Sequence, residues 1–302
     1  DGRILFIWNN TTPLPEKEGI SGVWEDVFTN RDVLHAAISD DDGKSWKGFR
    51  ELYMNPHRND FDYENADRSF SLDISVQQSQ SVELEDGLVL VSLGQHKDIR
   101  KLLLFDLNWL NETSRTDDFS EGLENWSTFM YQKGVVGHCA YNRADGAQLV
   151  PNPEVEEKSV LKVARVDNDE LEISNQGAVW NFPALHKGRF KTSVYIPEGS
   201  QGGRLSLSDR WFNPSDTTAY KFAMYSFDLT GLEQNKWNDL VFEWDIASDN
   251  QNCCVKDNQG NEIATLPLNF VTINGISYVH FISTASEEDT KGFLVERVES
   301  KP

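Results

Sequence analysis

The chain has 302 residues, with 28 Lys and Arg against 49 Asp and Glu, so its formal net charge is −21. This balance argues against nucleic acid, because nucleic-acid binding depends on basic side chains that neutralise phosphates. It also argues against an anionic membrane surface. No apolar run reaches the roughly 18 residues of a membrane span, whereas a neutral glycan, or an anionic one met by local arginines, stays compatible with the charge.

Short apolar runs bounded by turn residues recur along the chain, which is the signal of β-strands. No long stretch has helical apolar spacing, so the sequence predicts an all-β protein. The first strand opens almost at residue 1, which suggests a processed N-terminus, and no signal peptide precedes it. In chain order, the predicted strands and hairpin turn include 4–8, 33–38, 87–93, 101–105, 188–196, 219–225, 240–244 and the turn 257–261.

A polar segment without periodicity divides the chain. We expect a first domain at 1–112, a linker at 113–118 and a second domain at 119–302. In the second domain the alternation of apolar and polar residues predicts one packed and one wet face, as in an antiparallel sandwich. Many short strands over this length indicate a jelly roll or a lectin-like sandwich.

The most specific segment is 39–46, which reads Ser-Asp-Asp-Asp-Gly-Lys-Ser-Trp. It resembles the Asp-box, Ser-x-Asp-x-Gly-x-Thr/Ser-Trp. Asp41 is expected to accept backbone hydrogen bonds, Gly43 to take a backbone angle that other residues avoid, and Trp46 to anchor the turn. We therefore expect Asp41 to be structural and not catalytic.

On this motif, on the opening Asp-Gly-Arg-Ile-Leu and on Glu-Leu-Glu-Asp-Gly at 83–87, residues 1–110 resemble the sialidase-like propellers. Residues 119–302 resemble the concanavalin-like sandwiches often fused to carbohydrate-active enzymes. A blade needs roughly 40–50 residues, so the first domain holds about two blades. The resemblance implies further blades, from the same precursor or from another chain.

The resemblance also suggests a site. Arg31, just ahead of the Asp-box strand, matches a position of the arginine triad that grips a carboxylate. Glutamine stands where the family has its tyrosine nucleophile, so ordinary sialidase chemistry is not expected. The expected catalytic residues are Arg31, His35, Gln78 and His96, and the expected substrate-binding residues are Arg68, Gln80, Gln95 and Trp211, the last placed in an exposed loop.

Three readings of function stay open. The first is an exo-acting glycoside hydrolase that acts on a terminal sugar, and an acidic sugar is one form of this hypothesis. The second is a glycan-binding protein without catalysis, and the third is a structural module. The partner is expected to be a glycan or polysaccharide, the location extracellular or periplasmic, and no cofactor is expected, with structural calcium near Asp245, Asp249 and Asp257 as the alternative.

Three cysteines are present: Cys139, Cys253 and Cys254. Their odd number excludes complete pairing within the chain. A bridge from Cys139 to either of the others and three buried free thiols are both compatible with the sequence.

Overall fold

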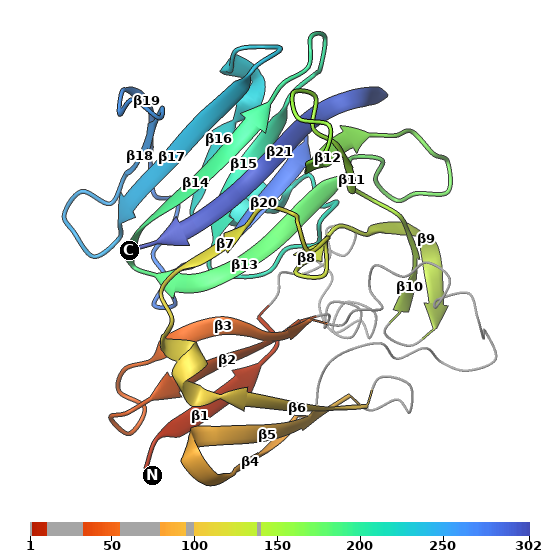
Figure 1. Cartoon of the computed structure of the whole chain (residues 1–302). Coiled ribbons are helices and arrows are strands. Elements are labelled where there is room, and N and C mark those ends of the chain that lie inside the picture. The colour runs from red at the N-terminus through yellow and green to blue at the C-terminus, as the bar shows by residue number, and fades with distance from the viewer. Residues whose placement is uncertain (1, 11–32, 55–78, 95–99, 138–139) are drawn as a thin grey trace.

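The computed structural model describes residues 2–10, 33–54, 79–94, 100–137 and 140–302. Regular structure in these ranges consists of strands and short 3₁₀ turns, which confirms the predicted all-β class. Two small sheets from the first third of the chain lie beneath a larger sandwich (Figure 1). The 3₁₀ turns are η3 (Glu85–Gly87), η4 (Leu107–Asn111), η5 (Ala219–Phe222) and η6 (Leu229–Gly231).

Each small sheet is an antiparallel meander of three described strands that follow one another in the chain. The middle strands face each other, so that Leu34 and Ile38 of one sheet share a core with Val89 and Val91 of the other. A propeller blade has four strands, whereas each of these sheets has three described strands, so the expected two blades stay a prediction. The first sheet contains β1 (Ile4–Trp8), β2 (Val33–Ser39) and β3 (Lys47–Met54), and the second contains β4 (Gln80–Glu83), β5 (Leu88–Leu93) and β6 (Lys101–Asp106).

The rest of the chain forms a two-layer sandwich, as predicted. Trp126, Trp180, Phe190, Phe242 and Phe281 are fully buried between its layers. In spatial order, the larger layer contains β11 (Gln148–Pro151), β12 (Ser159–Arg165), β21 (Asp289–Lys301), β14 (Lys187–Tyr195), β17 (Trp237–Asp245), β18 (Cys253–Lys256) and β19 (Glu262–Leu266). The smaller layer contains β16 (Tyr225–Asp228), β15 (Gly203–Ser208), β20 (Ile276–Ser283), β13 (Gly177–Leu185) and β8 (Trp126–Ser127).

Two sequence expectations fail within this sandwich. Part of the expected linker 113–118 is a strand, β7 (Arg115–Asp117), which pairs with β21; its polar sequence suits an outer strand as well as a linker. The expected strand 219–225 is mostly the turn η5, because the Asp216 carboxylate accepts hydrogen bonds from the backbone and hydroxyl of Thr218 and starts a turn there. A separate hairpin pairs β9 (Met130–Gly137) with β10 (Ala140–Ala144).

The Asp-box-like turn forms as expected between β2 and β3. The Asp41 carboxylate accepts hydrogen bonds from the backbone N–H of Ser45 at 2.8 Å and from its hydroxyl at 2.6 Å. These bonds lower the pKa of Asp41 to about 2. Gly43 has a φ of 81°, in the left-handed region, and the Trp46 indole N–H donates to the Gly43 carbonyl at 3.2 Å. Asp41 therefore holds the turn together.

The second small sheet has one uncovered apolar face, which we call the outer face of β4–β6. Val82 on β4 lies opposite Leu90 on β5, which lies opposite Leu104 on β6. Leu102, Leu104 and Val82 are 73%, 55% and 53% exposed. An exposed sheet face made of aliphatic side chains is characteristic of an interaction surface.

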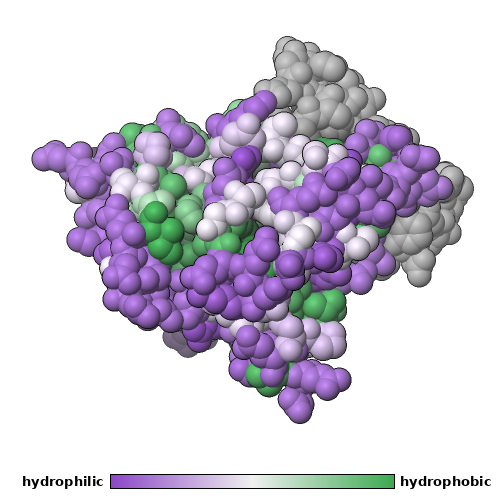
Figure 2. Space-filling model, turned by 90° about the horizontal axis from the view of Figure 1, so that it is seen from above, coloured by the Kyte–Doolittle hydropathy of each residue, from purple (hydrophilic) through white to green (hydrophobic). Residues whose placement is uncertain are grey.

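The face of the molecule seen from above is predominantly hydrophilic, as the net charge suggests, and its hydrophobic residues gather mainly in one hollow (Figure 2). No helix in the described part of the chain is long and apolar enough to cross a membrane.

Candidate functional site

The structure describes three of the eight expected site residues, His35, Gln80 and Trp211. Arg31, Arg68, Gln78, Gln95 and His96 lie outside the described residues. Their proposed roles therefore remain predictions.

His35 and Gln80 are described, and they lie on different sheets. The His35 side chain on β2 is fully buried and is hydrogen-bonded to the Tyr278 hydroxyl of the sandwich. Gln80 on β4 is exposed and borders a hollow of about 640 Å³ together with Ser92 and Arg100. Gln80 lines this hollow and His35 does not.

Trp211 was expected in an exposed loop, where it would bind substrate, and this expectation is wrong. Its side chain is fully buried, its indole N–H donates to the Ser127 hydroxyl at 2.7 Å, and its ring stacks on Phe129. The backbone carbonyl of Asn10 accepts a hydrogen bond from the Trp211 N–H at 3.0 Å. Trp211 is therefore part of a buried cluster with Val33 of β2 and Phe129, so the ring cannot stack on a sugar in this structure.

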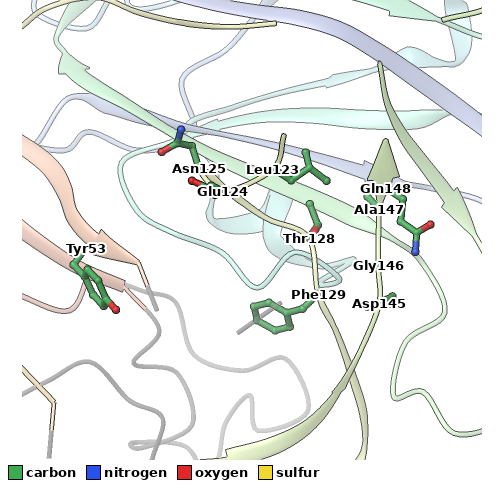
Figure 3. A pocket seen from close by; sticks show the side chains of 10 residues that line it. All are labelled: Tyr53, Leu123, Glu124, Asn125, Thr128, Phe129, Asp145, Gly146, Ala147 and Gln148. Carbon is green, nitrogen blue, oxygen red and sulfur yellow. The ribbon is translucent and has the colours of Figure 1, made fainter. Parts of the chain in front are cut away.

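A different group of residues forms a pocket of about 650 Å³ where the first small sheet meets the sandwich (Figure 3). Tyr53 comes from β3, and the other residues come from the two segments that flank the β9–β10 hairpin in the chain, 123–129 and 145–148. Thr128, Phe129, Gly146 and Ala147 are buried, whereas Glu124, Asn125, Asp145 and Gln148 are exposed at the rim. We call this the junction pocket; its lining is Tyr53, Leu123, Glu124, Asn125, Thr128, Phe129, Asp145, Gly146, Ala147 and Gln148.

Gly146 sets how closely the two ends of the hairpin approach. A Cβ atom at this position would lie 1.6 Å from the Thr128 carbonyl oxygen, so only glycine allows the observed packing. The Gln176 side-chain amide also donates to the Gly146 carbonyl at 3.1 Å. These contacts fix Asp145 and Gln148 on one side of the pocket and Thr128 and Phe129 on the other.

The rim of the junction pocket offers hydrogen-bonding groups that the protein does not use. Among the described residues, the side chains of Glu124, Asn125, Asp145 and Gln148 make no hydrogen bond or ion pair with another residue. No lysine or arginine is among the described residues that line the pocket. Carboxylate and amide groups above an apolar floor suit an uncharged, hydroxyl-rich ligand.

Sequence reasoning missed this pocket, because its residues are far apart in the chain. The one local signal was Asp145-Gly146, a dipeptide typical of tight turns. That signal marks a turn and does not mark a site.

In the described ranges, no three His, Cys, Asp or Glu side chains are grouped so that they could hold a metal ion. Of the acidic residues considered for calcium, Asp257 instead accepts hydrogen bonds within its own hairpin turn, from Gln259 and Asn261. Cys253 and Cys254 are free thiols, and burial raises the pKa of Cys253. Cys139 lies outside the described residues.

No protein-family model matches the chain. No curated protein matches it either.

The solved structures similar to this chain include two sialidases and a glucanase. A sialidase is 12% identical with a TM-score of 0.36, and the alignment covers 75% of this chain and 22% of that one. A Trypanosoma rangeli sialidase in complex with 2,3-difluorosialic acid is 14% identical with a TM-score of 0.33. The alignment covers 99% of this chain and 48% of that one. A family 16 endo-glucanase from Bacteroides ovatus is 12% identical with a TM-score of 0.39. The alignment covers 62% of this chain and 99% of that one.

This chain therefore spans less than half the length of either sialidase. At these identities and TM-scores the likeness carries no argument about function.

Proposed function

We propose that the protein recognises a neutral glycan in the junction pocket. The observation that carries this proposal is the set of four unpaired polar side chains, Glu124, Asn125, Asp145 and Gln148, above a buried apolar floor. Sugars present hydroxyl groups to such a rim and C–H groups to such a floor. The two carboxylates disfavour an acidic sugar in this pocket, because like charges would approach each other there.

The likeness of residues 39–46 to the Asp-box supports a glycan-directed role. The sequence is compatible with an extracellular or periplasmic location, where such glycans are met. Because ordinary sialidase chemistry is not expected, we rank binding above hydrolysis.

Hydrolysis of a glycoside is the second candidate. Glu124 and Asp145 place two carboxyl groups in one pocket, and most glycoside hydrolases use such a pair as acid and base or nucleophile. The expected catalytic residues Arg31, Gln78 and His96 belong to this candidate as well.

We also propose that a further antiparallel sheet covers the outer face of β4–β6, supplied by the same precursor or by another chain. The first small sheet packs on the opposite face of β5 through the same kind of aliphatic row. Stacking of another sheet would remove Leu102 and Leu104 from water.

The test of glycan recognition combines a glycan array with a panel of aryl glycosides. The wild-type chain is expected to bind neutral oligosaccharides, and the double variant Glu124→Gln/Asp145→Asn to bind them at least tenfold more weakly. Glu156→Gln/Asp249→Asn, which neutralises two acidic residues outside the pocket, is the matched control. Release of aglycone that the pocket variant abolishes would favour the hydrolase, and equal binding by all three proteins would refute the proposal.

A further inference from the structure

Four polar side chains meet at the contact between the first small sheet and the sandwich. His35 on β2 lies opposite Glu51 on β3, and Asn181 on β13 lies opposite Tyr278 on β20. Each pair is therefore a cross-strand pair of its own sheet, and the two pairs face each other. We call His35, Glu51, Asn181 and Tyr278 the interface quartet.

The quartet is joined by hydrogen bonds across the interface. The Tyr278 hydroxyl donates to the Glu51 carboxylate at 2.8 Å and is also bonded to Nε2 of His35. Because the hydroxyl has one proton, its bond to Glu51 requires that His35 Nε2–H be the donor in the second bond. The Glu51 backbone N–H donates to the Asn181 amide oxygen at 3.1 Å, so both sheets contribute donors and acceptors.

The sandwich side of the quartet is itself held in place. The Asn181 amide donates to the Ser277 carbonyl at 3.0 Å, and Arg115 donates to the Asn181 backbone carbonyl at 2.8 Å. Tyr278 is 1% exposed. A buried and connected polar network of this kind fixes one geometry between two layers, because each unmade bond would leave a polar group without water.

Both walls of the junction pocket are attached to this quartet. Tyr53 follows Glu51 by two residues on β3, across an irregularity in the pairing with β2, and such bulges re-aim the side chains beside them. On the opposite wall, Phe129 packs in the same buried cluster as Tyr278. A shift of the first sheet on the sandwich would therefore change the separation of Tyr53 from Phe129.

We infer that the interface quartet couples occupancy of the junction pocket to the docking of the first small sheet on the sandwich. This inference rests on the proposed glycan recognition. A ligand that contacts both walls stabilises the docked arrangement, and by reciprocity a weakened quartet lowers affinity for that ligand.

The test compares two tyrosines that each lose one buried hydroxyl. Tyr278→Phe removes the bonds to Glu51 and His35. Tyr225 belongs to the edge strand β16 and is not part of the pocket lining, and Tyr225→Phe removes its bond to the Gln251 carbonyl. The probes are cellotetraose, maltotetraose and lacto-N-tetraose, measured by titration calorimetry. Tyr278→Phe is expected to weaken binding of the bound probe at least fivefold, and Tyr225→Phe less than twofold.

A second readout needs no ligand. Amide hydrogen exchange of residues 49–53 and 126–130 is expected to be faster in Tyr278→Phe than in the wild type and unchanged in Tyr225→Phe. A Tyr278→Phe variant with wild-type affinity and wild-type exchange overturns the inference, as do equal effects in both variants. If the wild type binds no probe, the proposed glycan recognition fails, and the exchange data alone then decide whether the quartet couples the two walls.

Discussion

His35 is an uncharged histidine whose function follows from its burial. From the sequence it was expected among the catalytic residues. In the structure its ring lies between two aromatic rings, with ring centroids 5.7 Å from Trp8 and 5.5 Å from Tyr278. Burial lowers the pKa of His35 from 6.5 to about 3. A neutral imidazole with Nε2–H is the state that the quartet requires.

Measuring the free energy of unfolding as a function of pH tests whether His35 is neutral in the folded protein. The pKa of His280 is likewise lowered, to about 4, by burial. Between about pH 6.5 and pH 4 the unfolded chain binds protons at both histidines and the folded chain does not, so the free energy of unfolding should fall as pH drops, by roughly 1 kcal/mol per pH unit for each histidine. Above about pH 6.5 these two groups should contribute no slope.

The control for this prediction is His35→Gln, whose side-chain amide can still donate to Tyr278 but does not titrate. Urea denaturation across this pH range should show a smaller slope in the variant than in the wild type. An unchanged slope would mean that His35 is already protonated, or exposed, in the folded protein.

Trp211 shows why single residues are hard to place from sequence. The local run Trp-Phe-Asn-Pro at 211–214 is typical of a surface loop. Nothing in it indicates that the Asn10 carbonyl binds the Trp211 backbone N–H or that Phe129 stacks on the ring. Exposure of an aromatic side chain depends on distant parts of the chain. The expected role of Gln80, which is exposed beside Arg100, stays a prediction.

Elements governed by local chemistry were predicted well. The Asp-box-like turn and the 257–261 hairpin both form, because their Asp side chains bond backbone groups only a few residues away. The strand predicted at 219–225 was wrong since the turn chemistry of Asp216 and Thr218 overrides the apolar alternation that follows. The junction pocket could not be predicted, because it needs β3 beside both ends of a distant hairpin.

Gly146 gives a test at the scale of the β9–β10 hairpin. Gly146→Ala would force a Cβ atom against the Thr128 carbonyl oxygen, and we expect a loss of about 1–3 kcal/mol in the free energy of unfolding, as for other overpacked sites. Gly231→Ala is the control, because nothing lies within 4 Å of its added Cβ. Urea denaturation measures both, and equal stabilities would show that Thr128 does not approach Gly146 as described.

At the scale of the whole molecule, the described layers are packed unequally. Among the described residues, the first small sheet packs against both the second sheet and the sandwich, whereas only one face of β4–β6 packs against another described sheet. This asymmetry is what the proposed further sheet would relieve. It also means that the chain by itself presents aliphatic side chains to water.

Introducing charged side chains on the outer face of β4–β6 tests whether this face is exposed to water. Leu102→Glu/Leu104→Glu should reduce binding of a hydrophobic dye and self-association while leaving the melting temperature nearly unchanged, because both side chains are already exposed. Leu103→Glu, on the packed face of the same strand, should lower the melting temperature clearly. Equal melting temperatures for the two variants would contradict the assigned faces.

The junction pocket as a glycan site is the central claim, and carbene footprinting with mass spectrometry tests it most directly. A bound neutral oligosaccharide should protect Tyr53 and the segments 123–129 and 145–148 from labelling, and Glu124→Gln/Asp145→Asn should remove that protection. Protection confined to other segments, with these left fully labelled at saturation, would contradict the claim.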